Sequence, residues 1–169
     1  MALVAALCAV LDDHQEQARP NPNLRTALAE SARLNQQTSI RGFELFRHMV
    51  LNIAARNQDD HVKNIAFLMN KQGGWALAPA YDMTYSDNAS GAWTATHQMT
   101  MNGKRDGFVL ADFEECAKAA SMKRGRARAI IGEVQAAVTR WAEFAAAATL
   151  ADDWRDTIAR THRLSFAEK

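Results

Sequence analysis

NQDDHVKNIAFLMNKQGGWALAPAYD, residues 57–82, is the stretch of sequence that decides the fold. Seven of its first eight residues are polar or charged. Two short apolar runs follow, IAFLMN at 65–70 and WALAPA at 75–80, on either side of KQGG at 71–74. Paired glycines supply the positive φ angles that a tight turn between antiparallel strands needs. The pattern therefore predicts a β-hairpin with a polar loop at its entrance.

Two helices are predicted upstream of this stretch. Residues 2–11 are almost continuously apolar, and RPNPN at 19–23 then breaks the chain, because proline lacks a backbone donor and restricts its predecessor. Leucine and alanine at helical spacing mark 24–34 as the second helix. Since 2–11 lacks a basic leader and runs straight into two aspartates, we expect a buried helix and not a signal peptide.

A third helix is predicted from Thr38 or Ser39, either of which can cap it, to near Arg56. Its apolar residues recur at spacings of three and four, which places them on one stripe facing a core. These residues are Phe43, Phe46, Val50 and Ile53. Because the polar loop follows directly, a rigid helix should hold it in place.

Beyond the hairpin the chain is predicted to be extended or irregular, and then helical. WTATHQMTMNG at 93–103 alternates in the period-2 manner of a half-buried strand. Three helices are expected at about 111–122, 125–149 and 152–163, and the longest has one apolar side. That side carries Ile130, Val134, Val138, Trp141 and Ala145. The predicted fold class is mainly α with a small β-hairpin.

Composition and charge restrict the class of protein. Of the 169 residues, 48% are hydrophobic and 23% are charged, which suits a single soluble domain over 1–169. The formal net charge is only +1, so no direct binding of nucleic acid is expected. The apolar runs are too short for a membrane-spanning helix. Cys8 and Cys116 form no CxxC pair, which favours a reducing cytoplasm.

The polar loop holds the candidate site. Asp59 and Asn64 have the spacing of a protein-kinase catalytic loop, in which the aspartate orients the substrate hydroxyl and the asparagine holds Mg²⁺. Asp82 ends the second apolar run, where the hairpin should return to the loop, and offers a second carboxylate for the metal. Lys63 can place its ammonium near a phosphate, and His61 either contacts nucleotide or braces the loop.

Phosphoryl transfer suits this set of residues, because it depends on positioning and on neutralising charge with Mg²⁺ and hard oxygen ligands. The spacing makes Asn64 and Asp82 the expected metal ligands. Asp59 is the expected general base, which accepts the proton of an attacking Ser or Thr hydroxyl.

The run NIAARNQDDHVKNIAFLMNKQGGWALAPAYDMTYS, residues 52–86, resembles the C-terminal signature of HipA-like serine/threonine kinases, the toxins of bacterial toxin–antitoxin pairs. In that signature N-x-D-D-H-x-K-N precedes a hairpin, and P-x-Y-D follows the hairpin. GAWTATHQMTMNGK at 91–104 is also similar to the family's next segment. The likeness is good from about residue 40 to residue 122.

The resemblance implies a protein-kinase-like, two-lobed fold, of which this chain would be the helical C-lobe, with ATP and Mg as cofactors. It implies that Asp59 is the catalytic base and that Asn64 and Asp82 bind Mg²⁺. The residues bordering the nucleotide would be His61, Lys63, Asn64, Tyr81 and Asp82. The implied partners are a protein substrate, in known cases an aminoacyl-tRNA synthetase, and an antitoxin with a DNA-binding domain.

The nucleotide-gripping N-lobe is expected to be absent from this chain. A kinase needs a glycine-rich loop and a strand lysine paired with a helix glutamate, all N-terminal to the catalytic loop. Only 56 residues precede Asn57, and their pattern is helical. A truncated product, one half of a split protein and a degenerate family member are three open explanations. The rival hypothesis is a non-catalytic module that docks an antitoxin or an N-lobe partner.

One cluster of the polar loop has a structural explanation beside the functional one. Asp59, Asp60 and His61 could form a zinc or two-metal site, but a zinc site usually has more nitrogen or sulfur ligands. Without the family pattern these three residues would be interpreted as a solvated loop that caps neighbouring helices.

Two other patterns are more typical of structure than of function. His97, Met99 and Met101 alternate as copper ligands can, yet methionines on one strand face usually fill a core. The basic residues at 123–128 are either a solvated helix face or a partner site for RNA or a phosphorylated protein, and the solvated face is the commoner case.

Overall fold

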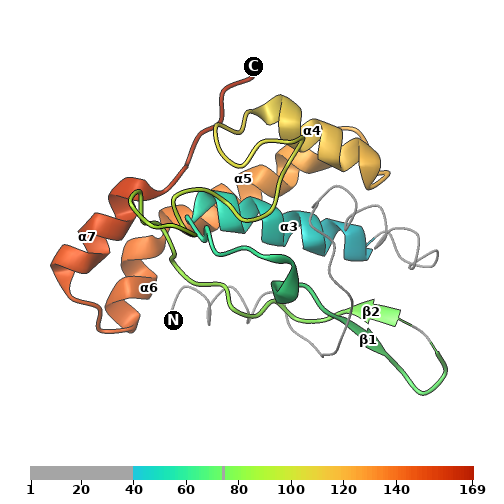
Figure 1. The fold of residues 1–169 in the computed structure, drawn as a ribbon, viewed down its shortest axis with the longest axis horizontal. Helices are drawn as coiled ribbons and strands as arrows, with labels where there is room; N and C mark the ends of the chain where they lie inside the picture. The colour runs from blue at the N-terminus through green and yellow to red at the C-terminus, as the bar shows by residue number, and fades with distance from the viewer. Residues whose placement is uncertain (1–39, 74) are drawn as a thin grey trace.

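The computed structural model describes residues 40–73 and 75–169, and the two helices predicted at 2–11 and 24–34 lie outside these described residues. Five α-helices and one two-stranded antiparallel sheet form the described part of the chain (Figure 1). The fold is therefore mainly α with a small β-hairpin, as the sequence predicts.

The described elements follow one another along the chain as a central helix, a hairpin and four further helices. They are α3 (Ile40–Ala54), the 3-10 turn η1 (Val62–Asn64), β1 (Phe67–Met69), β2 (Trp75–Leu77), α4 (Leu110–Ala119), α5 (Arg126–Thr139), α6 (Trp141–Ala147) and α7 (Asp152–Thr161). Within the described ranges, no helix is both long enough and apolar enough to cross a membrane.

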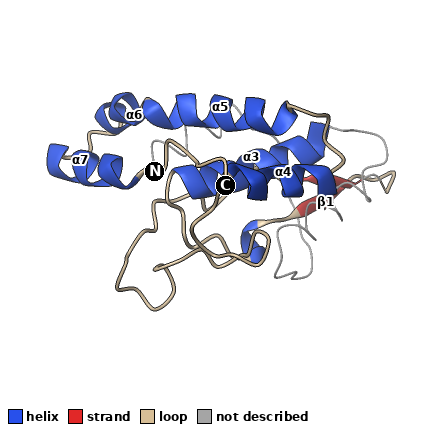
Figure 2. Ribbon diagram, turned by 90° about the horizontal axis from the view of Figure 1, so that it is seen from above, coloured by secondary structure: helices blue, strands red, loops and turns tan. Residues whose placement is uncertain are grey.

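The central helix is α3, and its apolar stripe faces the core as predicted. Phe46, Val50 and Ile53 are at most 1% exposed, and half-buried Phe43 packs against the same core. Seen from above, α5 and α6 run along one side of the molecule, α3 and α4 lie beneath them, and loops occupy the opposite side (Figure 2). Burial of this stripe holds α3 in place, and the candidate loop begins where α3 ends.

Aromatic rings join α3 to α4 and to the C-terminal tail. The ring of Phe46 meets that of Phe113 edge-on, with centroids 6.4 Å apart, and Phe113 in turn lies 4.7 Å from Phe166. The tail also forms two backbone hydrogen bonds. Arg163 N donates to Ala54 O at 2.9 Å, and Leu110 N donates to Ala167 O at 2.8 Å. Residues after α7 thus close over the ends of α3 and α4.

Phe46→Ala should lower the free energy of unfolding by about 3–5 kcal/mol, because it removes a fully buried ring from a close-packed core. Urea unfolding followed by circular dichroism measures this loss. The matched control is Trp93→Ala, whose ring is 75% exposed and whose removal should change stability by about 0.5 kcal/mol or less. Similar losses for the two variants would contradict the assignment of the core.

The predicted hairpin is confirmed, with strands shorter than the apolar runs. Phe67 pairs with Leu77, and Met69 pairs with Trp75. Gly73 in the turn has a φ of 80°, a left-handed conformation that favours glycine. One hydrogen bond extends the pairing beyond β2, from Ala78 N to Ala66 O at 2.9 Å. Proline at position 79 then has no donor to continue the ladder.

The segment 93–103 shows the predicted alternation of burial without becoming a strand. His97, Met99 and Met101 are at most 3% exposed, so they belong to the core. An isolated bridge joins Met101 to Lys104, and the His97 N–H donates to Arg105 O at 3.1 Å. Two neighbouring backbone groups, Gln98 N and His97 O, bond to side chains in place of a neighbouring strand. Side-chain partners satisfy the backbone as well as a ladder does, so the segment stays irregular.

The single helix predicted over 125–149 is wrong in one respect, because the chain turns at Arg140 and forms α5 and α6 separately. The Arg140 N–H donates to Ala137 O at 3.1 Å, a tighter step than an α-helix makes. The turn lets Trp141 leave the main core and pack with Ile158 of α7 in a second cluster. The Trp141 indole N–H also donates to a carbonyl oxygen of α7, 2.9 Å away.

His48 on α3 makes stability depend on pH. Burial lowers its pKa from 6.5 to about 4, and the charge of Arg47 adds a smaller effect in the same direction. In the unfolded chain His48 has an ordinary pKa, so between these two values the unfolded state binds more protons. The stability associated with neutral His48 is therefore complete above about pH 6.5 and is lost as the pH falls toward 4.

Between pH 7 and pH 4 the unmodified chain should lose about 3 kcal/mol more unfolding free energy than His48→Gln does. Urea unfolding of both proteins at half-unit pH steps gives the difference directly. Carboxylates titrate equally in the two proteins, so their contribution cancels. Parallel pH profiles would mean that His48 is not held in its neutral form.

Candidate functional site

The polar loop leaves the end of α3 through a left-handed residue, Arg56, whose φ is 62°. The Arg56 guanidinium donates two hydrogen bonds to the Asp87 carboxylate, from Nε to Oδ2 at 3.1 Å and from Nη2 to Oδ1 at 2.8 Å. Its carbonyl oxygen accepts a bond from Ser86 N, 3.0 Å away. The start of the loop is thereby fixed to a segment thirty residues further along the chain.

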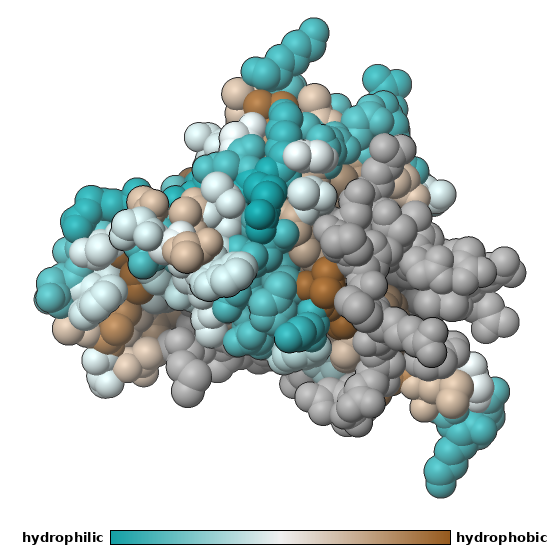
Figure 3. All heavy atoms as spheres, viewed as in Figure 1, coloured by the Kyte–Doolittle hydropathy of each residue, from teal (hydrophilic) through white to brown (hydrophobic). Residues whose placement is uncertain are grey.

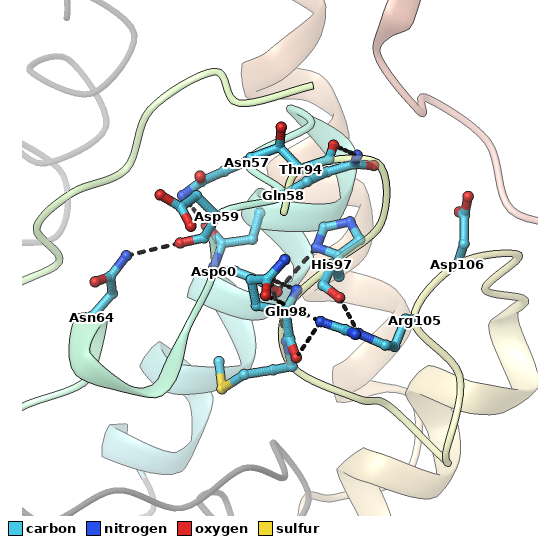
Figure 4. Close-up of polar contacts among 12 residues, drawn as sticks. Asn57, Gln58, Asp59, Asp60, Asn64, Thr94, His97, Gln98, Arg105 and Asp106 are labelled. Atoms are coloured by element: carbon cyan, nitrogen blue, oxygen red, sulfur yellow. Dashed lines mark hydrogen bonds and ion pairs between the residues drawn. The ribbon is translucent and has the colours of Figure 1, made fainter. Parts of the chain in front are cut away.

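Two buried amides fasten the loop to its surroundings (Figure 4). Asn57, 4% exposed, donates Nδ2 to Asn52 Oδ1 at 3.1 Å and to Asp82 O at 3.2 Å. Gln58 is fully buried and donates Nε2 to Thr94 O at 2.5 Å. Because both side chains point into the protein, they position the loop and do not face a ligand on its outer side.

Asp60 is the most deeply anchored carboxylate of the loop, at 2% exposed. Its Oδ2 lies 3.0 Å from His97 Nδ1, and its Oδ1 accepts the backbone N–H of Gln98 at 2.7 Å (Figure 4). This contact is not predicted from the sequence. The period-2 alternation of the sequence at 93–103 is the signal that could have revealed it. This pattern places His97 on the inner face, where a polar ring needs a partner.

Asp60→Asn should destabilise the protein by roughly 1–3 kcal/mol, because a neutral amide weakens the contact with His97 and the hydrogen bond from Gln98. The neighbouring variant Asp59→Asn changes a half-buried side chain and should cost about 0.5 kcal/mol or less. Chemical denaturation of both variants tests the contrast. Equal losses would show that Asp60 does not carry the anchoring role.

Asp59 and Asn64 are joined across the 3-10 turn. Asn64 Nδ2 donates to the backbone oxygen of Asp59 at 3.1 Å (Figure 4). A backbone carbonyl oxygen only accepts hydrogen bonds, so this bond identifies the side-chain nitrogen and oxygen of Asn64. The Asn64 carbonyl oxygen accepts no hydrogen bond from the described residues. The half-buried side chain of Asp59 lies at the same turn.

Tyr81 and Asp82 are held against the loop from the other side. The Tyr81 hydroxyl donates to the Lys63 carbonyl oxygen, and Asn57 holds the Asp82 carbonyl oxygen. Burial, with a smaller contribution from the Asp82 charge, raises the pKa of Tyr81, so the hydroxyl keeps its proton and can donate. These two bonds bring the loop and the residues after the hairpin together, as the sequence analysis expected of this end of the hairpin.

The backbone of Asp82 is left-handed, with a φ of 53°, and its side chain is exposed. Non-glycine residues adopt this conformation uncommonly, and aspartate is one of those that tolerate it best. Lys63 is also exposed, whereas His61 is half-buried with Nδ1 lacking a partner among the described residues. The exposed charges of the site are therefore one carboxylate and one ammonium.

Within the described ranges, no three His, Cys, Asp or Glu side chains gather closely enough to hold a metal. Asp60 faces His97 and does not join Asp59 and His61, so the zinc arrangement considered from the sequence does not form. Mg²⁺ makes a smaller demand, since it keeps several waters and takes one or two protein oxygens beside substrate phosphates. Asn64 and Asp82 offer hard oxygen atoms of this kind.

The remaining sequence candidates have structural roles. Core burial accounts for His97, Met99 and Met101. Two members of the basic run are ion-paired: Arg126 with Glu133 at 2.9 Å, and Arg128 with Glu114 at 2.8 Å and with Glu168 at 2.7 Å. Charges already paired on a solvated face have less to offer a partner.

The fold and the site define a class of protein: a helical domain in which a loop carrying Asp59 and Asn64 packs against a hairpin. The model of the HipA-like C-terminal domain matches residues 4–141, and the chain belongs to this family. HipA of Shewanella oneidensis MR-1, in a toxin–antitoxin complex with HipB and its operator DNA, is similar in structure, with a TM-score of 0.65 at 16% sequence identity.

That similarity covers 85% of this chain and 34% of the Shewanella chain, so this chain corresponds to about a third of its solved relative. At such low identity the likeness establishes a shared fold. No curated protein matches the chain in sequence.

Proposed function

We propose that this domain takes part in ATP- and Mg²⁺-dependent phosphorylation of a Ser or Thr hydroxyl on a protein, as a part of a HipA-like toxin. The observation that carries the proposal is the fastening of Asp82 to the polar loop. Asn57 holds the Asp82 carbonyl oxygen at 3.2 Å, and Tyr81 bonds to the carbonyl of Lys63. These contacts keep the expected metal ligands on adjacent segments, although their sequence positions differ by eighteen residues.

The ligands proposed for Mg²⁺ are the Asn64 carbonyl oxygen and the Asp82 carboxylate. The bond from Asn64 Nδ2 to Asp59 O supports this role, because it leaves the correct end of the amide for a cation. When bound, Mg²⁺ would neutralise the phosphate oxygens of ATP. The exposure of the Asp82 side chain also supports a ligand role, since its carboxylate can be reached from solvent.

Asp59 is the proposed general base. Its carboxylate would accept the proton of the attacking hydroxyl, a contribution worth on the order of 10²- to 10⁴-fold in rate. Asp60, next in the chain, supports this role indirectly, because its buried contacts hold the loop backbone still. His61, Lys63 and Tyr81 are proposed to border the nucleotide, with the exposed Lys63 ammonium near the phosphates.

Partners follow from the family and are part of the same proposal. The Shewanella relative is found with HipB and operator DNA, and we propose that an antitoxin likewise restrains the protein to which this domain belongs. A protein substrate, such as an aminoacyl-tRNA synthetase, and a nucleotide-gripping N-lobe complete the proposed set. We further propose that 1–169 forms one C-terminal catalytic-loop domain and acts in the cytoplasm.

Calorimetric titration of ATP into the whole chain tests the site. Binding should require Mg²⁺, and Asp82→Asn should weaken it roughly tenfold or more, since a charged metal ligand is lost. Asp59→Asn removes the proposed base but no metal ligand, so it should bind ATP within about twofold of the unmodified chain. Asp153→Asn, at an exposed carboxylate on α7, is the control outside the site.

Binding that is the same in Mg²⁺ and in EDTA, or unchanged in Asp82→Asn, would contradict the proposed site. Such a result would favour the rival hypothesis, a non-catalytic module that docks an antitoxin or an N-lobe partner.

A further inference from the structure

A cavity of about 140 Å³ lies behind Asp82, between α3, α6, α7 and the residues that follow the hairpin. Apolar side chains form most of its wall, including Leu51, Met83, Trp141, Leu150 and Ile158. On the face seen in Figure 3, apolar side chains also show between hydrophilic ones over α6 and α7. For scale, an engineered apolar cavity of roughly 150 Å³ binds benzene. The space therefore suits a single small ring.

The wall of the cavity carries no fixed charge. None of the described residues that line it is Asp, Glu, Lys or Arg. His162 also lines it, and burial lowers the pKa of His162, so a neutral imidazole faces the space near pH 7. A charged molecule would lose its hydration here without gaining a counter-charge. An occupant should therefore be uncharged.

Two buried polar atoms of the lining residues lack hydrogen-bond partners among the described residues. One is Asn57 Oδ1, and the other is His162 Nε2. The Asn57 amide cannot be reversed, because its Nδ2 donates to Asp82 O, which only accepts. Trp141 is different, since its indole N–H already donates to Arg155 O at 2.9 Å. Buried polar atoms usually have partners, and both of these atoms belong to residues that line the cavity, so an occupant that bonds to them would be favoured there.

We propose that this cavity binds a small uncharged ring compound, of the size of a phenol, which donates a hydroxyl or N–H hydrogen to Asn57 Oδ1 and meets His162 Nε2 as its second polar contact. The apolar ring would lie against Leu51, Trp141 and Ile158. The proposal is independent of the proposed kinase function, because it requires neither nucleotide nor metal.

The test follows the ¹⁵N–¹H signal of the Trp141 indole in the whole chain during titration with phenol, without ATP or Mg²⁺. We expect a saturable shift. Toluene has nearly the same shape but no donor, so it should bind roughly threefold to tenfold more weakly, the value of one buried neutral hydrogen bond. Benzenesulfonate, which is charged, should leave the signal unchanged.

Two variants reduce the space from different sides. Thr84→Trp places a large ring at an exposed lining position, and Leu150→Phe enlarges a half-buried one. Both should abolish the saturable shift or weaken it at least tenfold, and if Thr84→Trp fails to fold, Leu150→Phe decides. Ala142→Trp, at an exposed position of α6 outside the cavity, is the matched control and should bind like the unmodified chain.

Three outcomes would overturn the proposal. A shift that never saturates, or no shift, would mean that the cavity holds only water. Binding that persists in both cavity variants would place phenol elsewhere on the protein. Equal affinities for phenol and toluene would exclude the proposed hydrogen bond from phenol to Asn57 Oδ1. None of these outcomes bears on ATP binding, so they are distinguishable from failure of the proposed function.

Discussion

The buried carboxylate of Asp60 is the constraint on which the geometry of the loop depends. It is 2% exposed and meets both a ring nitrogen of His97 and the backbone N–H of Gln98. Unpaired, such a charge in the interior would destabilise the fold by several kcal/mol, so the loop and segment 93–103 must keep this register. Arg105, which donates to the His97 carbonyl oxygen at 2.5 Å, holds the same segment from its other side.

Around this anchor the site combines side chains that are buried in the protein with side chains that are half-buried or exposed. Asn57, Gln58 and Asp60 point into the protein, whereas Asp59 is half-buried and Lys63 is exposed. Most polar atoms of these inward side chains form hydrogen bonds to other segments, which makes the loop rigid without regular secondary structure. Rigidity of this kind is what catalysis by positioning requires, because the reacting groups must already be in place.

Local patterns predicted those parts of the molecule that local interactions decide. The stripe of α3, the hairpin and the Asp59–Asn64 spacing depend on near neighbours, and the structure has the helix and hairpin where they were expected. Two features depend on partners far along the chain and were missed. Asp60 finds His97 thirty-seven residues away, and the helix breaks at Arg140 because Trp141 packs against α7. Helical periodicity alone continues unbroken through that turn.

The residues after α7 contribute to the packing of α3 and α4. The family match stops at residue 141, yet Arg163 N caps the last turn of α3 at Ala54, immediately ahead of the loop. Phe166 and Ala167 complete the surroundings of α4. Contacts that hold α3 and α4 in place therefore come from residues beyond the family match. Truncating this protein after residue 141 would expose the C-terminal end of α3, where the polar loop begins.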